Sequence, residues 1–524
     1  MSTASNQSKR NVARNTVVVS LWTMVSRVFG AVRDLVVAHL FGATWTADAF
    51  YIAQTIPNAF RRLVGEGAVA AVLVPTYAGR LEGQDEQVAR RYARALLGIW
   101  LLTLLVLVVV GVVAAPLLVG LFAAGYHDNP DAFSLTVSLT RWMFPYLGLV
   151  SVVGFFGGIA NSHGRFGASA ASPVVFNIFI ILGAIVPMSF VPNPIYGLAV
   201  GVVVGGFAQL ALLSGDLIAG KIMIKPVWKP KDADLPEAWQ LMLPQLFGIA
   251  IYQINIIVLR AYASFLPEGS VTQYYNASRL QELALGVFAV AIATASQPTF
   301  ARLHAKGDRR ALSELFQGAV NSVMVVNIGA ATGLIALGLP ICIVLFGHGA
   351  FSAEAVELTA WTLFWLALAL IPVALVRVVG QVFYAFKQAK RPVQAGFWSM
   401  VVNAVSGAVF AYFFGIAGLG MGLLLATSVQ AYLLMRWMLP QLESWVPQAV
   451  SRATSKCVFA AMIMGVPAGF GGSWFPYERS SLEAFGLLSV IIGLGGFIYL
   501  FTATMFGIDE LGGIAERIAR RLRR

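Results

Sequence analysis

The sequence predicts an all-α polytopic membrane protein with fourteen transmembrane helices, arranged as two six-helix lobes in parallel repeat followed by two extra C-terminal helices. Of its 524 residues, 58% are hydrophobic and only 11% are charged, whereas soluble domains carry about 25% charged residues. Apolar stretches near the roughly 20-residue length that spans a bilayer recur along the whole chain. The connections between them alternate in charge.

Fourteen apolar stretches qualify as spans. The first follows a basic start, as in a signal peptide, but it contains charged residues and lacks a clear small-residue cleavage site, so we interpret it as a retained span. The expected spans are 17–40, 48–79, 95–123, 135–160, 171–190, 195–219, 239–265, 272–301, 315–346, 356–386, 393–414, 417–440, 453–472 and 484–507.

The charge alternation predicts an orientation. One set of connections, with the amino terminus and the Arg-rich tail, carries nearly all of the Lys and Arg outside the spans. The opposite set is acidic, with Arg479 as its one cation. Because basic loops stay on the cytoplasmic side, both termini are expected to be cytoplasmic.

An internal repeat predicts the lobes. Leu121-Phe122-x-x-Gly125 returns as Leu345-Phe346-x-x-Gly349, and Pro75-Thr76 returns as Pro298-Thr299, at a separation of about 223 residues. Six spans per copy give two parallel lobes with a substrate site between them. We expect an N-lobe at 1–225, a C-lobe at 226–442, and a region 443–524 with the last two spans and a basic tail.

Several function classes fit poorly. The net charge of +12 could suggest nucleic-acid binding, but the excess cations lie in short loops beside apolar spans, where membrane orientation explains them. The two cysteines, Cys342 and Cys457, are far apart and offer no disulfide framework. No phosphate-binding loop, metalloprotease or hydrolase motif occurs. We therefore expect a transporter rather than an enzyme, with no cofactor, metal or nucleic acid.

Arginines inside the spans are the main functional signal. At bilayer depth each charge costs about 2.5 to 3.5 kcal/mol, so eight facing lipid would cost on the order of 20 kcal/mol. They are therefore expected to face a polar cavity. Arginine stays charged and its planar fork fits phosphate or carboxylate, which predicts a site for an anion. The eight that carry this argument are Arg27, Arg33, Arg61, Arg62, Arg141, Arg260, Arg279 and Arg377.

Spacing suggests which of these arginines pair with acids. Arg62 and Glu66 are four residues apart and Arg279 and Glu282 are three apart, distances at which helical side chains meet. Arg61 points about 100° away from Arg62, which makes it the better candidate for a ligand contact.

These eight arginines outnumber the acids that the spans offer them, Asp34, Asp48, Glu66, Asp216 and Glu282. The count favours an anion site over the alternative that the charges only specify helix packing. Arg141, Arg260 and Arg377 are weaker candidates, because arginines near helix ends can reach the interface.

The densest motifs lie on the first two spans and the eighth. They resemble the MviN/MurJ family, the lipid II flippases of the multidrug/oligosaccharidyl-lipid/polysaccharide exporter superfamily. The motifs are Ser26-Arg27-Val28-Phe29-Gly30-x-x-Arg33-Asp34, Ala47-Asp48-Ala49-Phe50, Pro57-Asn58-x-x-Arg61-Arg62-x-x-x-Glu66-Gly67-Ala68 and Tyr274-Tyr275-x-x-x-Arg279-Leu280-x-Glu282.

The resemblance implies transfer of lipid II, the undecaprenyl-diphosphate-linked disaccharide pentapeptide, from the inner to the outer leaflet of the bacterial inner membrane. It further implies a lipid-tail groove at spans 13 and 14. The oligomeric state stays open, with a monomer as the expectation. By matching position, the diphosphate contacts would be Arg27, Arg33, Arg61 and Arg279, supported by Asp34, Asp48, Arg62, Glu66 and Glu282.

Three rival functions remain at this stage. A cationic-drug antiporter of the same superfamily would need an acidic cavity, which is the opposite of the charge count. A membrane glycosyltransferase would need acidic metal-binding residues in a loop, and none stands out. A polysaccharide-repeat flippase also handles a lipid diphosphate, so the family motifs alone separate it from a lipid II flippase.

Overall fold

The computed structural model describes residues 2–63, 65, 70–83, 85–186, 193–443, 447–473 and 481–507. Every regular element that it describes is a helix, as the sequence predicts. Contacts divide the chain into two compact units, Met1–Val271 and Thr272–Arg524. The lobe boundaries expected from the repeat stay a prediction.

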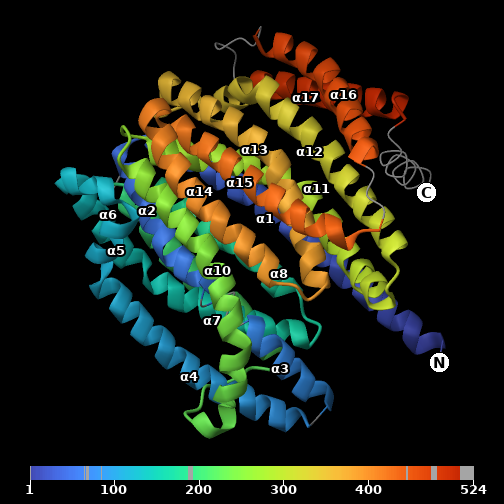
Figure 1. Ribbon diagram of the computed structural model, residues 1–524. Helices are drawn as coiled ribbons and strands as arrows, with labels where there is room; N and C mark the ends of the chain where they lie inside the picture. Colours follow the sequence, from blue (N-terminus) through green and yellow to red (C-terminus); the bar gives the residue numbers. More distant parts are fainter. Residues whose placement is uncertain are drawn as a thin grey trace. The chain divides into compact units, whose positions relative to one another are not determined.

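The first unit begins with a long helix (Figure 1), and two of its helix breaks fall at prolines. Pro116 lies in the first turn of α5, just after the break between α4 and α5, and Pro145 is the first residue of α7. A proline has no backbone N–H to donate, so it interrupts the hydrogen bonds that would continue the preceding helix. Its helices are α1 (Ser2–Phe41), α2 (Trp45–Phe60), α3 (Ala70–Gly83), α4 (Glu86–Val113), α5 (Ala115–Phe122), η2 (Ala124–Asp128), α6 (Pro130–Met143), α7 (Pro145–Ser162), α8 (Gly167–Ile185), α9 (Ile195–Ala219), η4 (Pro230–Ala233) and α10 (Leu235–Ser264).

The second unit contains the longest helices after α1. Its helices are α11 (Ser270–Lys306), α12 (Arg309–Phe346), α13 (Ala353–Ala385), α14 (Lys390–Phe414), α15 (Ile416–Met438), η5 (Leu439–Gln441), α16 (Pro447–Ser473) and α17 (Ser481–Met505). Within this unit α13 packs against α12 and α15, and α14 packs against α15.

Eleven helical stretches in the described residues are long and apolar enough to cross a membrane. They include Asn15–Phe41, which matches the predicted first span, and Pro130–Ser162, in which α6 and α7 together form one span. The other three predicted spans fall on α2 with α3, on α10 and on α11. The first of these stretches includes residues that the structure does not describe, and α10 and α11 are not among the eleven, so the count of fourteen stays a prediction.

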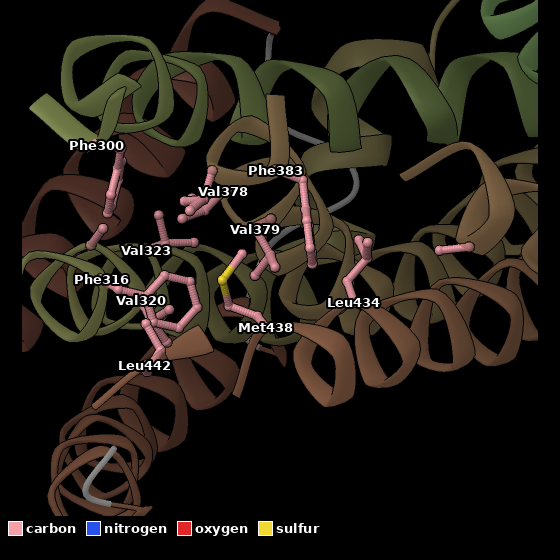
Figure 2. Packing of buried hydrophobic residues seen from close by; sticks show 14 of the residues in the cluster. Phe300, Phe316, Val320, Val323, Val378, Val379, Phe383, Leu434, Met438 and Leu442 are labelled. Carbon is pink, nitrogen blue, oxygen red and sulfur yellow. The ribbon is translucent and has the colours of Figure 1, made fainter. Parts of the chain in front are cut away.

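Each unit has its own apolar core. In the first unit, buried side chains of α3, α4, α7 and α9 meet, among them Tyr77, Leu97 and Phe155. In the second unit, α11, α12, α13 and α15 contribute the cluster that Figure 2 shows, with Phe316 and Phe383 fully buried. Among the helices that carry candidate site residues, α11 is thus held by close apolar packing.

The last two helices pack against α12. Figure 1 shows α16 and α17, coloured red, beside it. Cys457 and Met464 of α16 and Tyr499 of α17 form a buried cluster with Val325 and Ile328. The Tyr499 hydroxyl donates to the Val325 carbonyl, which satisfies its polar group inside apolar surroundings. This pair of helices therefore forms an addition to the packed helices α12 to α15.

Candidate anion-binding site

Arg33 on α1 is held in a buried network. Its Nε and Nη2 both donate to Asp34 Oδ1, at 3.0 and 2.6 Å, and its Nη1 donates to Asn177 Oδ1 on α8 at 3.0 Å. The side chains of Arg33 and Asp34 are only 9% and 11% exposed. A buried charge needs such compensation, and here a carboxylate and an amide provide it.

Asn177 also links this network to the preceding turns of α1. Its Nδ2 donates to the Ser26 carbonyl at 3.4 Å, and the backbone at Gly30 faces the same amide. One asparagine on α8 therefore touches α1 at two places two helical turns apart. The sequence placed Arg33 beside Asp34 but gave no reason to connect either with Asn177, which lies 144 residues away from Arg33.

Arg27 and Arg61 lie in more open surroundings. The Arg27 side chain is exposed on α1, and Arg61 is half-buried where α2 ends. Arg61 Nε donates to Asn58 Oδ1 at 3.2 Å. Beyond α2 the chain widens into a π-helical turn at residues 61–63 and 65, a local geometry that often accompanies functional sites.

Arg62 is half-buried in the same turn. Its expected partner, Glu66, lies outside the described residues, so this pair stays a prediction.

Arg279 on α11, in the second unit, has an accessible guanidinium. Its Nη1 donates to Glu282 Oε2 at 3.0 Å, which confirms the contact expected from the three-residue spacing. Its Nε donates to the Tyr275 hydroxyl at 3.1 Å, and its Cζ lies 5.2 Å from the centre of the Tyr275 ring. The side chains of Arg279 and Glu282 are 41% and 55% exposed. An anion could therefore reach this guanidinium without first separating a buried ion pair.

Asp48 makes a different kind of contact. It lies in the first turn of α2, is 3% exposed, and its Oδ2 accepts the Gly269 amide at 2.8 Å. Nearby, Glu268 Oε1 accepts the Trp45 amide at 2.9 Å. Gly269 has φ +85°, and a Cβ there would come within 2.5 Å of the Ala43 carbonyl. The turn before α11 is thus fixed to the start of α2 by two carboxylates.

The pKa of the Tyr126 hydroxyl responds to the charges around this turn. Burial is the main cause that raises the pKa of its hydroxyl, the carboxylates of Asp48 and Glu268 act in the same direction, and Arg260 acts against them. Arg260 is 9% exposed, and its Nη1 donates to the Val271 carbonyl at 3.3 Å. This arrangement explains why an arginine and two acids gather here without requiring a ligand.

The candidate residues thus divide by unit. The first unit contains Arg27, Arg33 and Arg61, and the second contains Arg279 with Glu282. The weaker candidates Arg141 and Arg377 are exposed on α6 and α13. An asparagine inside an apolar span marks Asn177 as a polar residue in need of a partner, but the sequence does not identify Arg33 as that partner.

These features define a class before any comparison. The chain is a multi-pass helical membrane protein in which arginines lie on or beside the spanning helices.

Comparison with known proteins supplies the family. The family model described as "Lipid II flippase MurJ" matches residues 37–482. A Vibrio cholerae protein called a probable lipid II flippase MurJ is 34% identical, with 95% of this chain and 97% of that protein covered. Lipid II flippase MurJ of Burkholderia cenocepacia is 28% identical, with 98% and 99% covered. The chain therefore belongs to the MurJ family.

Solved structures show the same fold. The structure titled "Lipid II flippase MurJ, inward closed conformation" has a TM-score of 0.79 at 22% identity, with 94% of this chain and 99% of that chain covered. An inward-facing MATE family transporter of the MOP superfamily has a TM-score of 0.66 at 14% identity, with 84% and 99% covered. The expected helical membrane fold is thus confirmed.

Proposed function

We propose that this chain is a lipid II flippase, which moves the undecaprenyl-diphosphate-linked disaccharide pentapeptide from the inner to the outer leaflet of the bacterial inner membrane. It is a transporter and not an enzyme. The observation that carries the proposal is membership of the MurJ family across residues 37–482. The same membership favours lipid II over the lipid-linked polysaccharide repeats considered as the alternative.

In the proposed mechanism, arginines hold the diphosphate of the substrate. Each fork can donate two parallel hydrogen bonds to phosphate oxygens, which replaces the water that the diphosphate loses. Arg27, Arg61 and Arg279 suit direct contact because their side chains are exposed or only partly buried. Asp34, Asp48, Arg62, Glu66 and Glu282 are supporting residues in this proposal.

Arg33 belongs to the same proposed site, but its guanidinium is buried and already paired with Asp34. Its bonds to Asp34 would have to rearrange before it could donate fully to a diphosphate. Until then it positions α1 through Asn177. Separate measurements of thermal stability and of substrate affinity, made on variants of Arg33 and of Arg279, therefore distinguish the roles of these two arginines.

The lipid tail is proposed to stay in the membrane beside the last two helices. α16 and α17 expose large apolar side chains, among them Phe459, Phe470 and Phe497. We further propose lobes at 1–225 and 226–442 that alternate the exposure of the arginines, and both termini in the cytoplasm. The basic loops support that orientation.

Complementation tests the proposal. The chain should sustain growth of a bacterium depleted of its own lipid II flippase, and Arg27→Ala, Arg61→Ala and Arg279→Ala should each fail to do so at wild-type membrane levels. Lipid-linked precursor extracted from the failing cells should be lipid II. Normal growth with all three variants, or accumulation of a different lipid-linked sugar, would reject the proposal.

A further inference from the structure

A second group of cations, none of them a residue of the proposed flippase site, lies at the basic end of α4. A partly open cavity of about 360 Å³ lies between the first turns of α4 and the segment that follows α9. Four cations and one carboxylate line it: Arg90, Arg91, Arg94 and Lys229, with Asp232. The lining therefore carries a clear excess of positive charge.

The cavity is built by backbone contacts rather than by loose surface loops. The Val227 amide donates to the Arg94 carbonyl at 3.0 Å. Val227 also crosses α4 at Gly98, where a Cβ would come within 2.4 Å of its carbonyl oxygen, so only glycine allows this approach. The segment is thus fixed against α4 and holds Lys229 over the cavity.

Two of the arginines help to fix that segment. Arg90 Nη2 donates to the Lys221 carbonyl at 3.0 Å, and its Nε donates to Glu86 at 2.9 Å. Arg94 Nε donates to the Lys225 carbonyl at 3.3 Å. By contrast, the exposed side chains of Arg91 and Lys229 make no hydrogen bond or ion pair with any residue that the structure describes. Their charges line the cavity without a protein partner in that part of the chain.

The same face of α4 continues as an exposed apolar surface. At 100° per residue, Arg91 and Arg94 lie on one side of the helix with Leu102, Leu105 and Val109. These three apolar side chains are all exposed. From Arg94 to Val109 the helix rises about 22 Å, which is most of one hydrocarbon core. A phosphate at the cavity would therefore lie at the membrane surface, directly above an apolar face that fits acyl chains.

Trp228 is a separate argument for a position of this cavity at the membrane–water interface. It follows Val227 at the crossing point and is 62% exposed. Exposed tryptophans concentrate where the hydrocarbon meets the headgroups. Membrane orientation alone explains why cations are numerous in this connection. It does not explain why they share one cavity above an apolar face.

We propose that this cavity binds the phosphate headgroup of an anionic membrane phospholipid. Arg91 and Lys229 are the principal contacts, and the acyl chains lie along α4. Basic pockets beside spanning helices recognise anionic headgroups through this chemistry. The proposal is independent of the flippase site, because none of its residues belongs to that site.

Hydrogen exchange tests the proposal on the full chain in nanodiscs. Phosphatidylglycerol added to phosphatidylcholine should slow amide exchange in residues 221–233 roughly tenfold, because a bound headgroup suppresses local opening. Arg91→Gln with Lys229→Gln should abolish this protection. Both side chains are exposed, so folding should survive. The matched control is Lys306→Gln with Arg309→Gln, two exposed cations on another connection, which should keep the protection.

A third arm separates lipid from free phosphate. Inorganic phosphate added to phosphatidylcholine nanodiscs should give no protection of residues 221–233. Protection by inorganic phosphate equal to that by phosphatidylglycerol would overturn the lipid assignment. The proposal would equally fail if exchange were the same with and without phosphatidylglycerol, or if the Arg91 and Lys229 variant stayed protected.

Discussion

Arg33 and Arg279 each pair with a carboxylate close by in the sequence, but their surroundings differ. The Arg33–Asp34 pair has side-chain exposures of 9% and 11% and gains a further bond from Asn177. The Arg279–Glu282 pair has exposures of 41% and 55% and rests against Tyr275. Burial makes an ion pair costly to break, whereas exposed pairs contribute little to stability. We therefore expect replacement of Arg33 to lower mainly the stability of the fold, and replacement of Arg279 to weaken mainly ligand binding.

The largest expected effect is on folding, from Arg33→Ala. Removing one partner of a buried ion pair costs about 3 to 5 kcal/mol. The purified variant should unfold at a clearly lower temperature than wild type, and its membrane level should fall. An unchanged melting temperature would show that the Arg33 network does not stabilise the first unit.

A smaller loss of stability is expected from Asn177→Ala. Arg33 keeps Asp34 but loses the hydrogen bond from its Nη1 to Asn177, and the loss of a buried hydrogen bond to a charged group costs about 1 to 3 kcal/mol. The drop in melting temperature should be smaller than for Arg33→Ala. When both changes are combined, the two effects should not add, because the residues share one network. Strict additivity would contradict this reading.

Arg61→Lys tests whether ligand binding needs the planar guanidinium or only its positive charge. Lysine keeps the charge but loses the planar fork, so two-point contact with a phosphate is lost. Arg61 is only half-buried, so stability should stay near wild type while growth in the complementation assay becomes partial or fails. Full activity would argue against two-point contact at this position.

The smallest expected effect on stability comes from Glu282→Gln. This carboxylate is exposed, and an exposed ion pair is worth about 0 to 1 kcal/mol. The melting temperature should change very little, in contrast with Asp34→Asn, which removes the charge from a buried pair. If Glu282→Gln and Asp34→Asn lowered the melting temperature by similar amounts, the proposed difference between the exposed and the buried ion pair would be wrong.

Local patterns predicted much of this molecule. Hydropathy located the helices, and the three-residue spacing of Arg279 and Glu282 predicted their contact. Contacts between distant segments could not be predicted in this way. Asp48 meets Gly269 across 221 residues, because the turn at Gly269 needs a positive φ and its amide then faces α2. Asn177 meets Arg33 only because α8 packs against α1.

Sequence also gave no measure of accessibility. Arg27, Arg33, Arg61 and Arg279 looked equivalent as arginines in or beside apolar spans. Packing makes Arg33 buried and leaves Arg27 exposed on the same helix. The distinction depends on which helices cover each face, and one helix's periodicity does not contain that information.

The affinity of the purified full chain for lipid II tests the central claim most directly. The wild type should be compared with Arg27→Gln/Arg61→Gln/Arg279→Gln, and with the control Arg302→Gln/Arg309→Gln/Arg310→Gln, which removes three arginines outside the proposed site. The account predicts at least roughly tenfold weaker binding for the first variant, since charge-assisted bonds contribute about 1.5 to 3 kcal/mol each, and near wild-type binding for the control. Equal affinity of all three proteins would contradict it.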